Sequence, residues 1–168
     1  MAGKLQDLKA GMEKERGVAR RPGMVYGLFG LLVFLGIGAV AGGLLLIMNP
    51  DGKSMGMPTT IMQRALFNDY RIPGVLLFLV FGVLPLAVAY SLLKRPDWRL
   101  FDRLNPFKEL HSAWAWSLYI GFGQIIWITV QTYVLNAVGV VHLFYIALGL
   151  AIQAVTLLPA VRGYCKRN

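Results

Sequence analysis

"MVYGLFGLLVFLGIGAVAGGLLLIM", residues 24–48, contains no Asp, Glu, Lys or Arg. A helix needs about 20 apolar residues to cross ~30 Å of hydrocarbon, because each residue adds about 1.5 Å. A segment within lipid must also satisfy its own backbone hydrogen bonds, and this one lacks the alternating pattern of a barrel strand. The segment therefore predicts a membrane-spanning helix.

Three more runs of this kind follow along the chain. They cover residues 72–93, 112–135 and 138–161. The chain is 57% hydrophobic and its mean hydropathy is +0.58, far more apolar than an ordinary soluble domain. These runs predict an all-α polytopic membrane protein, a bundle of four transmembrane helices. We expect the transmembrane domain over residues 24–162, between a basic segment at 1–23 and a short tail at 163–168.

The net charge of +9 could indicate a nucleic-acid partner, so the distribution of the charge matters. Of the 17 Lys and Arg residues, six precede the first run, five lie between the second and third, and three follow the fourth, whereas three lie between the first and second. The positive-inside rule therefore predicts cytoplasmic termini in the cell (plasma) membrane. Attraction to anionic membrane lipids accounts for the remaining charge, and we expect no nucleic-acid partner.

The connections predict short interfacial helices. Residues 4–20 alternate charge with apolar residues at helical spacing, and "TIMQRALF" (60–67) mixes apolar and polar residues after Pro58. "KRPDWRLFDRLNPFKELHSAW" (94–114) interleaves basic and aromatic residues, as is typical of a segment at the headgroups. The turn "NAVGV" (136–140) is short and uncharged, so we expect the last two helices to be antiparallel neighbours.

Glycine and proline give two expectations about the first two spans. Gly38 and Gly42 form a GxxxG pair, which lets helix backbones approach closely in lipid, either within this chain or in contact with a second copy. Pro85 lies in the middle of the second span, where it removes an intrahelical hydrogen bond and predicts a kink.

Polar residues follow one face of each of the last two spans. In the third span, Ser117, Gln124 and Gln131 recur every seven residues beside Trp127. In the fourth span the corresponding residues are His142, Tyr145, Gly149, Gln153 and Thr156. We call these residues the polar seam, and we expect the two faces to turn away from lipid. Antiparallel pairing predicts Gln131 at the depth of His142 and Tyr145, Gln124 opposite Gly149 or Gln153, and Ser117 near Thr156.

Two interpretations of the polar seam remain open. In the first, interhelical hydrogen bonds of about 0.6 kcal/mol each fix the register of the helices. In the second, the seam lines a small pocket with aromatic walls and polar handles. The candidate ligand-binding residues are Gln124, Trp127, Gln131, His142, Tyr145 and Gln153.

The sequence offers little for catalysis, a metal or a cofactor. The single cysteine, Cys165, excludes an intramolecular disulfide and a cysteine-rich metal site. His111 and His142 are expected at opposite faces of the membrane, too far apart to hold one haem iron. No Asp, Glu, Lys or Arg lies inside a predicted span, where proton or ion coupling usually requires one. We therefore expect no catalytic residues, no metal and no cofactor.

"LFNDYRIPGVLLFLVFGVLPLAVAYSLL", followed by "WAWSLYIGFGQIIWITVQ" and a short hairpin, resembles a group of uncharacterised small four-span prokaryotic integral membrane proteins. The similarity covers roughly residues 44 to 160. It implies four spans but no activity. We expect a non-enzymatic accessory or scaffold protein that associates with another membrane protein or forms a homo-oligomer. The alternative is a binder or carrier of a small lipophilic molecule, a quinone or lipid, in the polar seam.

Overall fold

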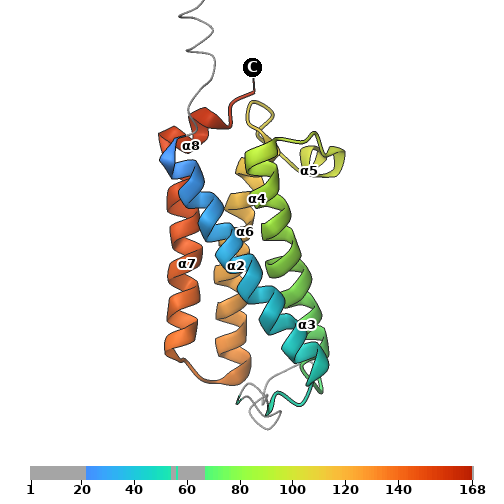
Figure 1. The fold of residues 1–168 in the computed structure, drawn as a ribbon. Helices are drawn as coiled ribbons and strands as arrows, with labels where there is room; N and C mark the ends of the chain where they lie inside the picture. The colour runs from blue at the N-terminus through green and yellow to red at the C-terminus, as the bar shows by residue number, and fades with distance from the viewer. Residues whose placement is uncertain (1–21, 54–55, 57–66, 168) are drawn as a thin grey trace, which may run out of the picture.

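The computed structural model describes residues 22–53, 56 and 67–167, and four helices in this part of the chain are long and apolar enough to cross a membrane (Figure 1). The spans are α2 (Gly23–Met48), a second span made of α3 (Arg71–Leu76), the π-helix η3 (Leu77–Val83) and α4 (Leu84–Lys94), then α6 (Ser112–Leu135) and α7 (Val140–Leu157). Two short helices, α5 (Arg99–Arg103) and α8 (Pro159–Tyr164), complete the described helices. The prediction of an all-α, four-span membrane protein is confirmed. The interfacial helices expected before residue 21 and at 60–67 lie outside the described residues, apart from Phe67.

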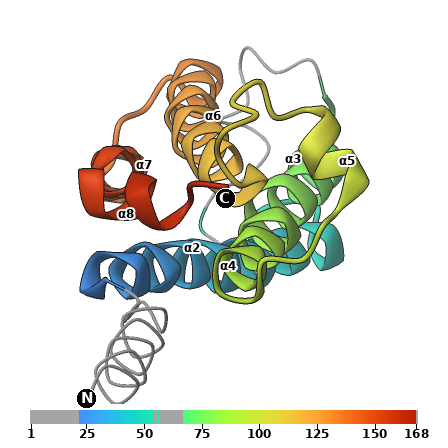
Figure 2. The same ribbon diagram turned by 90° about the horizontal axis from the view of Figure 1, so that it is seen from above.

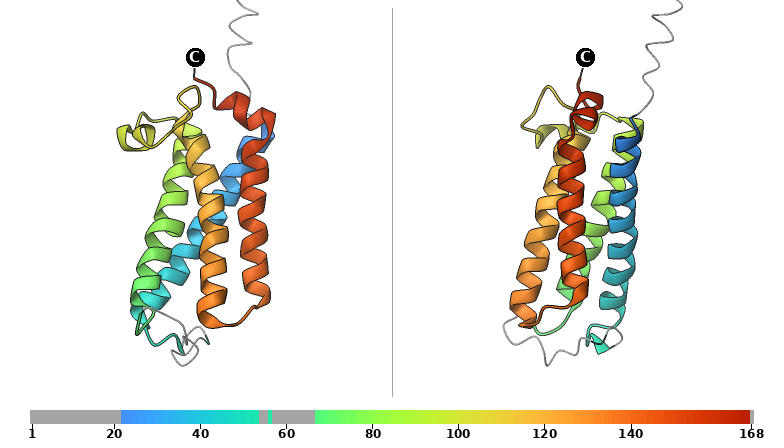
Figure 3. Two further views of the ribbon diagram at one scale, coloured as in Figure 1. Left: turned by 180° about the vertical axis from the view of Figure 1, so that it is seen from behind. Right: turned by 90° about the vertical axis from the view of Figure 1, so that its left-hand side faces the viewer.

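The four spans form a ring in which each packs against two others. Viewed along the bundle, α2 lies beside the second span and α7, and α6 lies beside α4 and α7 (Figure 2). α2 is inclined, so that it starts near α8 and ends near α3 (Figures 1 and 3). We call the end that carries α5 and α8 the basic end, and the end with the α6–α7 connection the turn end. Asn136 makes this connection with a left-handed φ of 48°.

The fourth span is shorter than predicted at both ends. The sequence run covers residues 138–161, but α7 begins at Val140 and ends at Leu157. Leu158 is extended, with φ −56° and ψ 137°, because it precedes Pro159, whose ring disfavours the helical conformation of the residue before it. The chain then turns into α8, which lies across the basic end (Figures 1 and 3).

Pro85 is accommodated by a π-helix in the preceding turns. The Leu84 N–H donates to the Leu79 carbonyl, five residues back, so the regular hydrogen-bond ladder ends just before the proline. α4 then starts at Leu84, which puts Pro85 in its first turn, where the missing N–H and the fixed φ are tolerated. The predicted disturbance at Pro85 therefore takes the form of a widened segment over Leu77–Val83.

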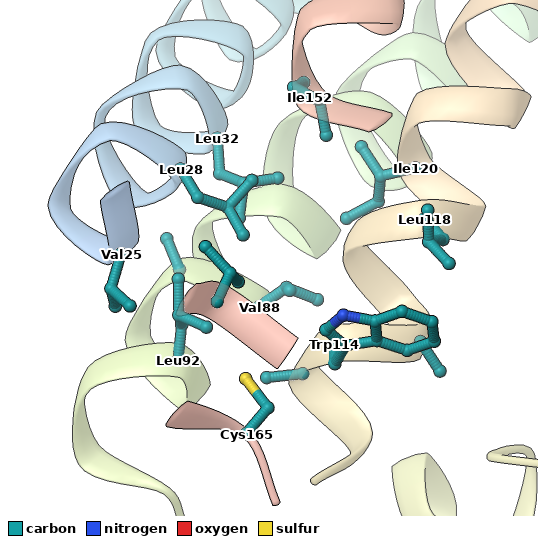
Figure 4. Close-up of a cluster of buried hydrophobic side chains, with 14 of the residues drawn as sticks. Val25, Leu28, Leu32, Val88, Leu92, Trp114, Leu118, Ile120, Ile152 and Cys165 are labelled. Atoms are coloured by element: carbon teal, nitrogen blue, oxygen red, sulfur yellow. The ribbon is translucent and has the colours of Figure 1, made fainter. Parts of the chain in front are cut away.

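The apolar core lies toward the basic end. Figure 4 shows side chains from the start of α2 and α6 meeting those from the end of α4 and α7. Its buried members include Val25, Leu28, Leu32, Val88, Leu92, Trp114 and Ile152. A smaller cluster, Leu46, Tyr70 and Leu135, lies toward the turn end. The two ends of the bundle are thus packed differently.

Candidate functional site

The α6–α7 hairpin crosses at two glycines. A Cβ at Gly121 would lie 2.7 Å from Gln153 Cγ and 3.0 Å from the Gly149 carbonyl oxygen. A Cβ at Gly149 would lie 3.1 Å from the Gly121 carbonyl oxygen and 3.4 Å from Gln124 Cγ. The two backbones therefore approach closely, as small residues permit in membranes. The aliphatic part of a glutamine side chain from the facing helix packs against each glycine.

Two glutamine amides consequently lie inside the hairpin, and both retain an unpartnered atom. Gln124 is 2% exposed. Its Oε1 atom and the buried Nε2 atom of Gln153 have no hydrogen-bond partner. A buried polar atom without a partner costs free energy, and more so in an apolar surrounding. Of the predicted seam contacts, the structure places Gln124 beside Gly149, as one of the two expected alternatives.

The aromatic members of the polar seam point to other helices. Trp127 contacts Phe81 of η3, with ring centroids 5.7 Å apart. The Tyr145 hydroxyl lies 3.2 Å from the position a Cβ would take at Gly38 of α2. These two side chains therefore link the hairpin to the first two spans.

The polar residues nearest the turn end are His142 and Gln131. His142 Nδ1 accepts a hydrogen bond of 2.9 Å from the Gly139 N–H, so this imidazole caps its own helix. Gln131 is half-buried. The candidate ligand-binding residues all lie on α6 and α7, but their side chains do not converge. Gln124 and Gln153 lie at the hairpin crossing, Trp127 contacts η3, Tyr145 contacts α2 and His142 caps α7.

Toward the basic end, the seam hydroxyls bond within their own helices. Ser117 donates to the Ala113 carbonyl and Thr156 to the Ile152 carbonyl, at 2.7 and 2.6 Å. The link between the helices comes from Trp114, whose Nε1–H donates to the Thr156 carbonyl at 2.8 Å. The sequence pattern missed this bond, because Trp114 lies outside the seven-residue repeat of polar residues.

The closest approach of α2 to the second span uses glycines next to the predicted pair. A Cβ at Gly43 would lie 2.8 Å from the Phe78 backbone nitrogen, and one at Gly36 would lie 3.1 Å from the Gly82 carbonyl oxygen. Gly42 makes only an ordinary contact with Leu77, at 3.5 Å, and Gly38 faces α7. The GxxxG spacing therefore located the packed region of α2, but the residues in closest contact are seven apart.

A second group of glycines on α2 faces outward. A Cβ at Gly23, Gly27 or Gly30 would meet nothing within 4 Å, and all three residues are exposed. Tyr26 is also exposed, at 52%. α2 thus carries one glycine face that is buried within the chain and another that is open at the basic end.

The basic end contains a contact that the sequence did not reveal. Residues 165–167, the C-terminal strap, run antiparallel to residues 109–111, with a bridge between Leu110 and Lys166. The His111 N–H donates to the Cys165 carbonyl at 2.7 Å, and the Arg167 N–H to the Glu109 carbonyl at 2.9 Å. Burial raises the pKa of the Cys165 thiol to about 11, so this cysteine stays protonated and a poor nucleophile near pH 7.

The strap is also held by side chains. The Arg95 guanidinium donates to the Lys166 carbonyl at 3.0 Å and lies over the Tyr164 ring. Arg167 forms an ion pair with Asp102. Among the described residues, no group of three or more His, Cys, Asp or Glu side chains could hold a metal ion. Compared with protein families, curated proteins and solved structures, the chain gave no match.

Proposed function

We propose that this chain is a non-enzymatic accessory or scaffold protein, which uses the outward glycines of α2 to dock another transmembrane helix. The supporting observation is that Gly23, Gly27 and Gly30 are open while the glycines further along α2 are already packed. Without hydrophobic drive between helices in lipid, close backbone approach at small residues is what favours association. The docked helix belongs to a second copy or to another membrane protein.

The test replaces the open glycines and measures association in the membrane. Gly27→Leu/Gly30→Leu should weaken association roughly tenfold, the equivalent of about 1.4 kcal/mol. Ala41→Leu is the control, because Ala41 is exposed on the same face but lies nearer the turn end. Energy transfer between two labelled copies identifies a homo-oligomer, and co-purification identifies a different polypeptide. A wild-type protein that associates with neither would contradict the proposal.

We infer that the basic end faces the cytoplasm of the cell membrane. Among the described residues, this end carries Lys94, Arg95, Arg99, Arg103, Lys108, Arg162, Lys166 and Arg167. At the turn end, Lys53 pairs with Asp51 and Arg71 with Asp69, so the described charges there offset each other. This asymmetry and the positive-inside rule support cytoplasmic termini. Membership of the small four-span prokaryotic group stays a proposal that rests on the sequence resemblance.

One observation favours the second candidate function, a binder of a small lipophilic molecule. The Gln124 Oε1 and Gln153 Nε2 atoms are buried and unpartnered. A ligand hydroxyl would donate to Oε1 or accept from Nε2, and a ligand carbonyl would accept from Nε2. Native mass spectrometry of the solubilised protein, combined with lipid extraction, should then detect a stoichiometric adduct that Gln124→Leu removes. If the wild-type chain carries no adduct, the amides have a structural role.

A further inference from the structure

α5 projects sideways from the basic end. Viewed along the bundle, it lies outside the ring of spanning helices, next to the second span (Figure 2). Seen from the side, α5 lies at the level where α4 ends and α6 begins (Figure 1). α5 therefore lies where the headgroups of one leaflet meet the bundle.

A chain of aromatic rings fixes α5 to the spans on either side. Tyr90 of α4 stacks on Trp98, with centroids 6.1 Å apart, and Trp98 contacts Phe101 at 5.0 Å. Phe101 contacts Trp116 of α6 at 4.8 Å, and the Trp116 Nε1–H donates to the Phe101 carbonyl at 3.2 Å. Trp and Tyr are enriched at membrane interfaces, where an apolar ring with a polar edge fits both phases.

The free surface of α5 combines exposed leucines with unpaired cations. Leu100 and Leu104 are 67% and 52% exposed and lie four residues apart. Arg99 and Arg103 have the same spacing and are exposed, and none of the ion pairs among the described residues involves either of them. The neighbouring acid, Asp102, is already paired with Arg167. The two arginines therefore remain free to pair with an anion outside the chain.

We propose that α5 is a binding site for anionic phospholipids, with Arg99 and Arg103 on the phosphate and Leu100 and Leu104 against the acyl chains. Arginine suits this ligand because its planar donors match phosphate oxygens. The aromatic contacts from Tyr90 to Trp116 hold α5 in place without the lipid, so lipid binding costs little conformational entropy of the backbone. This site is separate from the glycine face of α2.

The test measures lipid selectivity of the full chain in phosphatidylcholine vesicles, by electron spin resonance of spin-labelled phosphatidylglycerol and phosphatidylcholine. The wild type should prefer phosphatidylglycerol. Arg99→Gln/Arg103→Gln should lower this preference by at least about fivefold, because it removes the two cations that bind the lipid phosphate, and about 1 kcal/mol for one such contact corresponds to that factor. Arg99→Lys/Arg103→Lys, which keeps the charge but loses the planar donors, should give a preference between those of the wild type and the glutamine variant.

Arg162→Gln/Lys166→Gln is the matched control, because it removes two exposed basic side chains from the same end but from α8 and the strap. It should change the preference little. An equal loss in this control, or an unchanged preference in the Arg99/Arg103 glutamine variant, would overturn the proposal. Inorganic phosphate, compared with chloride at equal ionic strength, should not displace the lipid. Displacement would assign the arginines to a soluble anion instead.

Discussion

His111 is both the cap of α6 and a link to the strap. Its Nδ1 accepts a hydrogen bond of 3.2 Å from the Ala113 N–H, so the proton of the neutral ring lies on Nε2. Burial, together with the nearby Arg95 and Arg167, lowers the pKa of His111, while Asp102 and Asp97 act in the opposite direction. Acid must therefore place a proton on Nδ1 and break the capping bond.

Lowering the pH below the ordinary histidine pKa of ~6.5 should loosen the first turn of α6 and the strap. Because the pKa of His111 is lowered in the folded state, the unfolded state binds the proton more tightly. The contribution of neutral His111 to the free energy of unfolding is therefore present above pH ~6.5 and is lost as the pH falls below this value. The lost cap is worth about 1 kcal/mol. Hydrogen exchange of the Ala113 and Cys165–Arg167 amides, corrected for intrinsic rates, measures the change.

The variant His111→Asn provides the comparison, because asparagine caps a helix but does not titrate. Its exchange should be independent of pH between about 7.5 and 5.5 after the same correction. If the variant and the wild type respond equally to acid, another group is responsible for the opening.

For single residues, the sequence predicted the depth of a side chain in the bundle better than the helix that the side chain faces. Helical spacing placed Gln124 opposite Gly149 or Gln153, and the structure places it beside Gly149. Spacing alone could not show that Tyr145 faces α2 or that Trp127 faces Phe81, because the rotation of each helix is set by its neighbours. Nor could it show the role of His142 as a helix cap, which depends on the extended backbone of Gly139 at the start of α7.

Among the elements, the π-helix before Pro85 determines how the second span packs against α2. Gly74 and Gly82 both face α2 but are eight residues apart, whereas Gly36 and Gly43 are seven apart. Eight residues of a regular α-helix turn about 80° beyond two full turns. The π-helix between Gly74 and Gly82 holds an additional residue in its turn, so both glycines keep the same face.

Deleting Val80, which is 40% exposed within η3, should therefore destabilise the protein by about 3 kcal/mol. The deletion would restore a continuous α-helix and move the proline from a first turn into a helix interior. Adding Pro85→Ala to the deletion should recover most of this loss. Unfolding in mixed micelles, with Val80→Ala as the control, measures the differences. If the combined variant is no more stable than the deletion alone, the proline is not the cause of the π-helix.

Some element boundaries could be read from the sequence and others could not. Charged residues and proline mark where the first two spans begin and end. α6 covers the predicted run of 112–135 and ends at Asn136, the first residue of the uncharged turn. Pro159 was a visible stop signal within the fourth run, but hydropathy continues through it to Val161. The π-helix has no comparable hydropathy signal, because widening a helix leaves its composition unchanged.

The charges of the whole molecule predict its orientation. We expect Lys53→Cys to react with a membrane-impermeant maleimide added to intact cells, and Arg99→Cys not to react. Both changes are made in a Cys165→Ser background, so that each chain carries a single thiol. Permeabilised cells should label both variants, which shows that each thiol is reachable. Labelling of Arg99→Cys alone in intact cells would reverse the assigned topology.

The arrangement of the glycine contacts also bears on biogenesis. α2 meets the second span, and α6 meets α7, through glycines on helices that are neighbours in the sequence. Each pair can therefore associate as soon as it leaves the insertion machinery, before the other pair has been synthesised. The contacts between the pairs include the buried apolar side chains at the basic end. Substitutions such as Leu92→Ala should accordingly let both hairpins insert and delay only their joining, the last step of assembly.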